Sequence, residues 1–180
     1  MPVIDLPIGW TVVLDSIAWA ILQPSIAYLA IRLPDSVLGA DQWLYRTRAW
    51  ERGGSIYEKL FRVKAWKSWL PSGGPVFRGG FSMRRIVSHD TEYLRRWVKE
   101  TCRAELTHYI ALASSVLFFL WNPLWLALVM VLYAVITNVP CIIVQRYNRP
   151  YFVRLLSVRD SSADQPVLAG AGPMRAARPH

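Results

Sequence analysis

The sequence predicts an all-α integral membrane protein with about three transmembrane helices and an amphipathic interfacial helix in a cytoplasmic loop. Hydrophobic residues make up 53% of the chain, and nine Trp and eight Tyr suit side chains that lie among lipid headgroups. No Lys, Arg, Asp or Glu occurs between Leu106 and Val144. One bilayer crossing needs about 20 apolar residues, so this span can cross twice if the chain turns back at residues 121–123.

The first apolar segment runs from about Ile8 to Ile31 and is interrupted by Asp15 and Gln23. It lacks a basic leader and a clear small-residue cleavage site, so we interpret it as a retained transmembrane helix rather than a cleaved signal peptide. A carboxylate in lipid is unfavourable. Asp15 is therefore expected to face protein or water, or to lie near the outer headgroups.

The distribution of basic residues predicts the orientation. None precedes Arg32, 15 lie from Arg32 to Arg103, none lies in the turn at residues 121–123, and six follow Val144. By the positive-inside rule this is a multi-pass protein of the cell membrane, with its amino terminus outside and its carboxyl terminus in the cytoplasm. The net charge of +9 indicates contact with anionic membrane lipids, and no motif favours nucleic acid as a partner.

The loop between the first two crossings contains a predicted amphipathic helix over residues 55–70. Ser55 and Glu58 have the spacing of a capping box, and Pro71 is a stop signal. Such a helix would lie in the membrane interface or pack on the inner face of the protein itself. Its apolar side consists of Ile56, Leu60, Val63 and Leu70.

The remaining segments complete one membrane-embedded domain over residues 1–160. Residues 72–81, rich in Gly and Pro, are predicted to form a mobile loop. A helix is expected to start near Asp90 and to continue into the second crossing, with His89 immediately before it. Residues 161–180 lack periodicity and are predicted to be a disordered tail. Cys102 and Cys141 are expected to be free thiols.

Polar residues gather at both ends of the charge-free span. Glu105 and His108 share a helix face where it begins, and Asn138 lies near its end, so an antiparallel hairpin brings them together. A carboxylate that orients an imidazole produces a general base. The second E-x-x-H of a di-iron protein is absent. Arg146 and Arg149 suit a phosphate or carboxylate, although arginines are also expected at the inner end of any crossing helix.

The strings RAELTHY, KAWKSWLP and NVPCIIVQRYNRPY resemble the glycosyl-4,4'-diaponeurosporenoate acyltransferase family, small membrane enzymes of staphyloxanthin-type carotenoid biosynthesis. The likeness extends from about Arg32 to Leu155, and its most specific part is QRYNRP, from Gln145 to Pro150. It implies transfer of a fatty acyl group to a sugar hydroxyl of a glycosylated lipid, such as a carotenoid glycoside. The family motif itself assigns no catalytic residue.

Our hypothesis therefore assigns roles from residue chemistry. His108 is the general base, Glu105 orients it, and Asn138, together with Gln145, stabilises the oxyanion. Arginines hold the phosphates of the acyl donor, for which acyl-CoA is the most plausible candidate, and neither a cofactor nor a metal is expected. The predicted substrate-binding residues are Arg103, Gln145, Arg146, Asn148, Arg149 and Trp66.

Two alternatives remain open at this point. The chain could be a non-catalytic lipid-binding or assembly subunit. It could also be a metal-dependent lipid-modifying enzyme that uses His89, Glu105 and His108.

Overall fold

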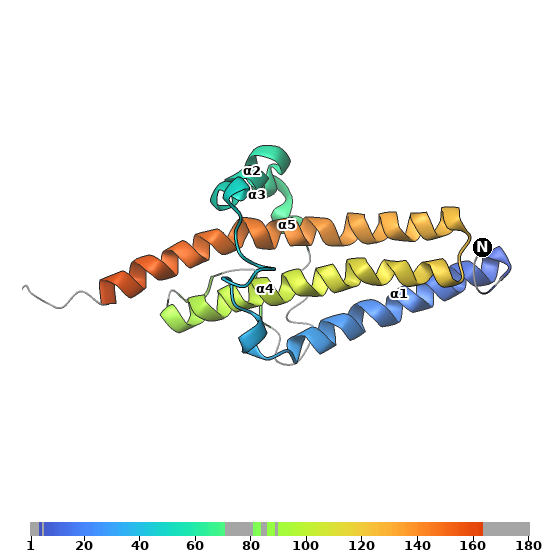
Figure 1. Ribbon diagram of the computed structural model, residues 1–180, viewed down its shortest axis with the longest axis horizontal. Helices are drawn as coiled ribbons and strands as arrows, with labels where there is room; N and C mark the ends of the chain where they lie inside the picture. The colour runs from blue at the N-terminus through green and yellow to red at the C-terminus, as the bar shows by residue number, and fades with distance from the viewer. Residues whose placement is uncertain (1–3, 5, 71–80, 84–85, 89, 164–180) are drawn as a thin grey trace, which may run out of the picture.

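The computed structural model describes residues 4, 6–70, 81–83, 86–88 and 90–163. Within that part of the chain all regular secondary structure is helical, which confirms the predicted all-α class. Three long helices lie along one axis, with α4 between α1 and α5, and the short helices α2 and α3 rest against α5 (Figure 1). In chain order the elements are α1 (Ile8–Ile31), η1 (Asp35–Val37), η2 (Ala49–Gly54), α2 (Ser55–Phe61), α3 (Val63–Trp66), η3 (Lys67–Trp69), α4 (Thr91–Ser114), η5 (Ser115–Leu120) and α5 (Leu124–Ala163).

Two helices of the described chain are long and apolar enough to cross a bilayer, α1 and the Leu124–Ser161 part of α5. Only 11% and 28% of their most apolar windows are buried, so most of these side chains face outward, unlike those of a soluble core helix. One stripe of α1 is buried against the protein, formed by Thr11, Asp15 and Trp19 at four-residue spacing. Asp15 thus faces protein, which is one of the two expected placements.

The predicted second crossing differs from the other two. The first half of α4 is polar, and its apolar half passes into the 3-10 helix η5 before the turn. The second crossing therefore stays a prediction. The hairpin itself is present, because α4 and α5 run antiparallel after a turn at residues 121–123 (Figure 1). Close to that turn Trp19 stacks on Phe118 at 4.7 Å, and both pack near Ala134. We call the turn the apolar end of the hairpin and its opposite end the polar end.

The prediction of one continuous helix over residues 55–70 is wrong. Arg62 adopts a left-handed conformation, with φ 50° and ψ 47°, and this separates α2 from α3. The bend turns both Tyr57 and Val63 onto Val144 of α5. In a straight helix two residues six positions apart would point in different directions, so the buried contact with α5 explains the break.

The predicted capping box at Ser55 is also wrong. Ser55 Oγ donates to the carbonyl of Arg52, and Glu58 accepts from the backbone N–H of Lys64 across the bend. A capping arrangement occurs earlier, where the backbone N–H of Arg48 donates to Glu51 Oε1 at 2.7 Å.

The predicted start of the long helix near Asp90 is confirmed, because Asp90 is the N-cap of α4. At the other end of the domain α5 continues to Ala163, three residues beyond the predicted boundary. Pro71, His89, nearly all of the predicted loop at residues 72–81 and the tail after Ala163 lie outside the described residues. Both cysteines are free thiols, as predicted.

Candidate functional site

His108 contacts Asn138 across the α4–α5 hairpin, as the predicted convergence requires. His108 Nδ1 lies 2.9 Å from Asn138 Oδ1, and Asn138 Nδ2 donates to the carbonyl of Ala134, also at 2.9 Å. A carbonyl can only accept, so the Asn138 amide nitrogen must face Ala134 and its oxygen must accept from His108. We therefore assign the proton of the neutral imidazole to Nδ1 from this network. Nε2 then carries the lone pair, and no described residue bonds to it.

The predicted pairing of Glu105 with His108 is wrong. Both Glu105 carboxylate oxygens are occupied by guanidinium groups of α5: Oε1 accepts from Arg146 Nε at 2.7 Å and Oε2 accepts from Arg149 Nη2. Glu105 is fully buried, at 0% exposure. A cationic guanidinium stabilises a buried carboxylate far more than a neutral imidazole would. Glu105 therefore pairs with Arg146 and Arg149 rather than with His108.

What we call the four-charge cluster consists of Glu51, Glu105, Arg146 and Arg149. Arg146 Nη1 donates to Glu51 Oε1 at 2.9 Å, and the Tyr57 hydroxyl donates to Glu51 Oε2, also at 2.9 Å. Burial, together with the bond to Glu51, raises the pKa of Tyr57 well above its usual range. Two carboxylates and two guanidiniums balance in charge, and together they fasten the η2–α2 segment to both arms of the hairpin.

Arg146 and Arg149 are therefore not free to hold the phosphates of a donor. Arg146 also donates to the carbonyl of Leu44 at 2.6 Å, and Arg149 donates to the carbonyl of Tyr45 at 2.7 Å and to Thr101 Oγ1 at 2.9 Å. Arg149 is only 2% exposed. These contacts favour a structural role for both arginines, and their donor-binding role stays a prediction.

Arg103 is also engaged within the protein. Its Nη1 donates to the carbonyls of Ala30 and Leu33, at 2.7 and 3.0 Å, where α1 ends. Its guanidinium further contacts Asp35 and Glu100. A cation at a helix carboxyl end satisfies exposed carbonyls and complements the helix dipole. Arg103 therefore joins α1 to α4, and its contact with donor phosphates stays a prediction.

The other predicted substrate contacts are Gln145, Asn148 and Trp66. Asn148 Oδ1 accepts from Lys67 Nζ at 3.2 Å, and Trp66 Nε1 donates to the carbonyl of Phe61 at 2.7 Å. The Lys67–Asn148 bond joins the loop to α5, and the Trp66–Phe61 bond lies within the loop. Gln145 is half-buried and makes no hydrogen bond to any described residue, which leaves its amide available.

A pocket of about 390 Å³ opens beside the cluster, between the η2–α2 segment and the hairpin. We call it the aromatic pocket. Its lining includes three residues that the sequence analysis did not select, Arg48, Trp50 and Tyr109. Nothing in the sequence indicates that residues near position 50 approach Tyr109 on α4. The pocket is lined by Arg48, Trp50, Tyr57, Tyr109, Ile142, Ile143 and Arg146.

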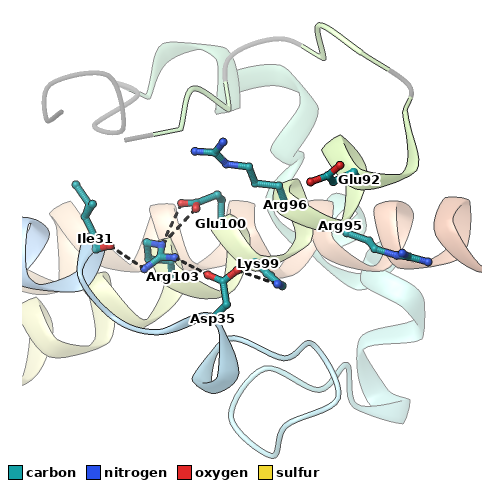
Figure 2. Close-up of a pocket in the computed structure, with 8 residues that line it drawn as sticks. All are labelled: Ile31, Asp35, Glu92, Arg95, Arg96, Lys99, Glu100 and Arg103. Carbon is teal, nitrogen blue, oxygen red and sulfur yellow. Dashed lines mark hydrogen bonds and ion pairs between the residues drawn. The ribbon is translucent and has the colours of Figure 1, made fainter. Parts of the chain in front are cut away.

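A second pocket, of about 500 Å³, lies at the polar end of the hairpin, where α4 begins near the end of α1. We call it the basic pocket. Figure 2 shows Arg103 bonded to Ile31, Glu100 and Asp35, while Lys99 Nζ donates to Asp35 at 2.8 Å. Lys99 and nearby arginines lower the pKa of Asp35. The pocket is lined by Ile31, Asp35, Glu92, Arg95, Arg96, Lys99, Glu100 and Arg103.

In the basic pocket Arg96 differs from the other cations. It forms no ion pair with a described residue and lies over the ring of Phe81 at 5.1 Å. Among the described residues no group of three or more His, Cys, Asp or Glu side chains could hold a metal ion. His89, the third ligand of the metal-dependent alternative, lies outside them.

The fold and site thus define a helical protein with two membrane-type helices and a polar centre built on a helical hairpin. The sequence profile of the glycosyl-4,4'-diaponeurosporenoate acyltransferase family matches residues 41–158. Proteins of that name from Staphylococcus aureus strains USA300, NCTC 8325 and bovine RF122/ET3-1 are each 34% identical over 143 residues, 79% of this chain and 86% of theirs.

The chain belongs to the glycosyl-4,4'-diaponeurosporenoate acyltransferase family, and the resemblance inferred from its sequence motifs is confirmed. It is accordingly an acyltransferase. No solved structure matches this chain.

Proposed function

We propose that this protein transfers a fatty acyl group to a sugar hydroxyl of a glycosylated membrane lipid, with His108 as the general base. The printed names of its relatives, which specify a glycosyl diaponeurosporenoate, favour a carotenoid glycoside as the acceptor. One observation carries the assignment of the base. Asn138 accepts from His108 Nδ1, so the lone pair of the imidazole lies on Nε2, which no described residue occupies.

In the proposed reaction His108 Nε2 removes the proton of the sugar hydroxyl as its oxygen attacks the acyl carbonyl carbon. A carbon–oxygen ester bond forms, the carbon–sulfur bond of the thioester breaks, and the proton passes from the imidazolium to the departing thiolate. Asn138 holds the imidazole and accepts from its Nδ1–H throughout. This positioning role replaces the oxyanion role predicted for Asn138, whose amide hydrogens are directed to Ala134 and Thr137. Gln145 remains a proposed substrate contact.

For the donor we propose an acyl-CoA that approaches from the cytoplasm. The basic pocket supports this assignment, because Arg96 offers a guanidinium that forms no ion pair with a described carboxylate. Arg96 precedes His108 by 12 positions on α4, and at about 1.5 Å per residue they lie about 18 Å apart along the axis. An extended pantetheine arm is of comparable length. The two residues lie on different faces of α4, so the arm would pass around this helix.

For the membrane we propose three crossings: α1, the apolar half of α4 with η5, and the first part of α5. The amino terminus is then outside and the carboxyl terminus in the cytoplasm, as the distribution of basic residues favours. The α2–η3 segment would lie among the inner headgroups. Leu60, Phe61 and Trp69 of this segment are exposed, next to the exposed cations Lys59 and Lys64.

The test is acyl transfer by purified protein from a labelled acyl-CoA to a glucosyl lipid, with mass spectrometry of the product. His108→Gln should lower the rate by roughly 10²–10⁴, since glutamine cannot accept the proton. A purified wild-type protein that forms no ester would refute the proposed pair of donor and acceptor. A His108→Gln variant with normal turnover would remove the base assignment.

Two substitutions of Asn138 separate positioning from oxyanion binding. Asn138→Asp keeps an oxygen that can accept from His108 Nδ1–H but removes the amide donors. Asn138→Leu removes both. If Asn138 positions the base, Asn138→Asp should retain most of the activity that Asn138→Leu loses. Equal loss in both variants, with thermal stability unchanged, would contradict positioning and favour the oxyanion role.

A further inference from the structure

The aromatic pocket combines two exposed or half-buried aromatic rings, an aliphatic floor and a polar rim. Trp50 is 61% exposed, and its ring meets that of Tyr57 edge-on at 6.2 Å, which supports the indole from one side. Ile142 and Ile143 of α5 form the apolar part of the lining. Small-molecule sites have this composition, with apolar and aromatic walls and a few polar groups that fix orientation.

We infer that the aromatic pocket binds the sugar headgroup of the acceptor and that Trp50 is the surface on which the sugar ring lies. This inference rests on the proposed function. A pyranose has one face of C–H groups and a rim of hydroxyls, so it matches an indole face beside guanidinium and phenol groups. A volume of about 390 Å³ is large enough for one or two sugar rings but not for a long acyl chain in addition.

The pocket adjoins the proposed base on both arms of the hairpin. Tyr109 directly follows His108 on α4, and Ile142 lies four residues after Asn138, one turn further along α5. His108 and Asn138 do not themselves line the pocket. A sugar ring bound in it would lie about one helical turn along α5 from the His108–Asn138 pair. Because Ile142 and Ile143 belong to the membrane-type helix α5, the apolar body of the acceptor can continue along this helix into the bilayer.

The charges of the pocket favour a neutral ligand over a phosphate. Arg146 is neutralised by Glu51 and Glu105, and the Nη2 of Arg48 donates to the carbonyl of Trp43 at 2.6 Å. The guanidinium of Arg48 also lies over the Trp43 ring, at 5.1 Å. Arg146 is thus compensated by two carboxylates, whereas Arg48 is held by a carbonyl and a ring and by no described carboxylate. A sugar needs only hydrogen bonds from Arg48 and Arg146, whereas a diphosphate would need the charge of both, and that of Arg146 is already compensated.

The first experiment measures the kinetics of Trp50 variants with a glucosyl lipid and an acyl-CoA. Trp50→Ala should raise the KM for the acceptor about tenfold, with kcat and the donor KM nearly unchanged, and Trp50→Phe should have a smaller effect. Trp69→Ala is the matched control, because Trp69 belongs to the same loop, is 84% exposed and does not line the pocket. A rise confined to the donor KM, or no rise at all, would overturn the inference.

The second experiment measures binding without turnover. Ile143→Cys, in a background with Cys102→Ser and Cys141→Ser, places one thiol in the pocket lining. An alkyl β-glucoside should slow maleimide labelling of this thiol, and neither the matching alkyl alcohol nor decanoyl-CoA should do so. Protection by decanoyl-CoA alone, or by none of the three, would overturn the sugar assignment. Protection by the glucoside in a protein that forms no ester would support the sugar site and refute the proposed reaction.

Discussion

Replacement of Arg149 tests whether the four-charge cluster stabilises the fold or binds the donor. Arg149 donates to Thr101, to the carbonyl of Tyr45 and to Glu105, and it is 2% exposed. In Arg149→Met the buried Glu105 loses one of its two cationic partners. Removing one member of a buried ion pair costs about 3–5 kcal/mol. At about 2–4 °C per kcal/mol for a chain of this length, the melting temperature should fall by roughly 6–20 °C.

A thiol-reactive fluorogenic dye can follow this unfolding in detergent, because Cys102 is fully buried in the native fold. Burial also raises the pKa of the Cys102 thiol to about 11, so the native protein should react slowly. Arg149→Lys should give an intermediate loss, since lysine keeps the charge but not the guanidinium fork. Adding Glu105→Gln to Arg149→Met should recover part of the loss, because the remaining Arg146 and Glu51 then balance in charge.

Arg154→Met is the control, because Arg154 lies on the exposed face of α5. Its melting temperature should stay within about 2 °C of the wild type, in line with the usual effect of surface substitutions. Unchanged melting of Arg149→Met together with a raised donor KM would refute the structural role. It would restore the donor-binding role that the sequence predicted.

Two further predictions concern the donor and the membrane. Arg96→Glu should raise the donor KM at least about tenfold and leave the acceptor KM unchanged, because it reverses the one cation of the basic pocket that forms no ion pair with a described carboxylate. Lys59→Glu, the same charge change in the α2 helix, is the control and should have little effect on the donor KM. Equal effects of the two substitutions would indicate a general electrostatic cause. In a cysteine-free background, Ile4→Cys should react with an impermeant thiol reagent in intact cells and Ser157→Cys only after permeabilisation; the reverse pattern would contradict the proposed orientation.

Features that depend on local pattern were accessible from the sequence. The charge-free span between Leu106 and Val144 predicted the antiparallel hairpin, and the apolar run from Ile8 to Ile31 coincides with α1. The meeting of His108 with Asn138 followed from the hairpin alone, because the start of one arm lies beside the end of the other.

Features that depend on distant partners were not accessible. Local spacing favoured a Glu105–His108 pair on one helix face, but Glu105 is buried, and its partners lie 41 and 44 positions away on α5. Glu51, which completes the cluster, lies 95 positions from Arg146. Nothing local indicates that these groups meet. Once they meet, the low dielectric of the interior strengthens their attraction, so Glu105 pairs with the arginines and not with His108.

The bend at Arg62 illustrates a different limit. Left-handed backbone conformations are uncommon outside glycine, and periodicity favoured one helix through this position. The observed break makes two buried contacts with α5, through Tyr57 and Val63, where a straight helix would make one. Tertiary burial therefore outweighs local propensity here.

Asp15, at the apolar end of the hairpin, provides the last prediction. It is 4% exposed, and its Oδ1 accepts from Trp121 Nε1 at 2.7 Å and from Asn122 Nδ2 at 2.8 Å, so it connects α1 to the turn before α5. Its Oδ2 has no hydrogen-bond partner among the described residues. One oxygen thus makes both contacts, and the negative charge is not needed for either.

Asp15→Asn should therefore melt close to the wild type, because an amide oxygen can accept both bonds. Asp15→Leu should be destabilised by about 2–6 kcal/mol, since the buried Asn122 amide and the half-buried Trp121 indole each lose a partner at about 1–3 kcal/mol. Ser16→Leu, on the exposed side of α1, is the control. In detergent the dye assay of Cys102 measures all three. Equal destabilisation by Asn and Leu at position 15 would show that the negative charge itself stabilises the fold. It would imply that Asp15 pairs with a cation or with accessible water in addition to Trp121 and Asn122.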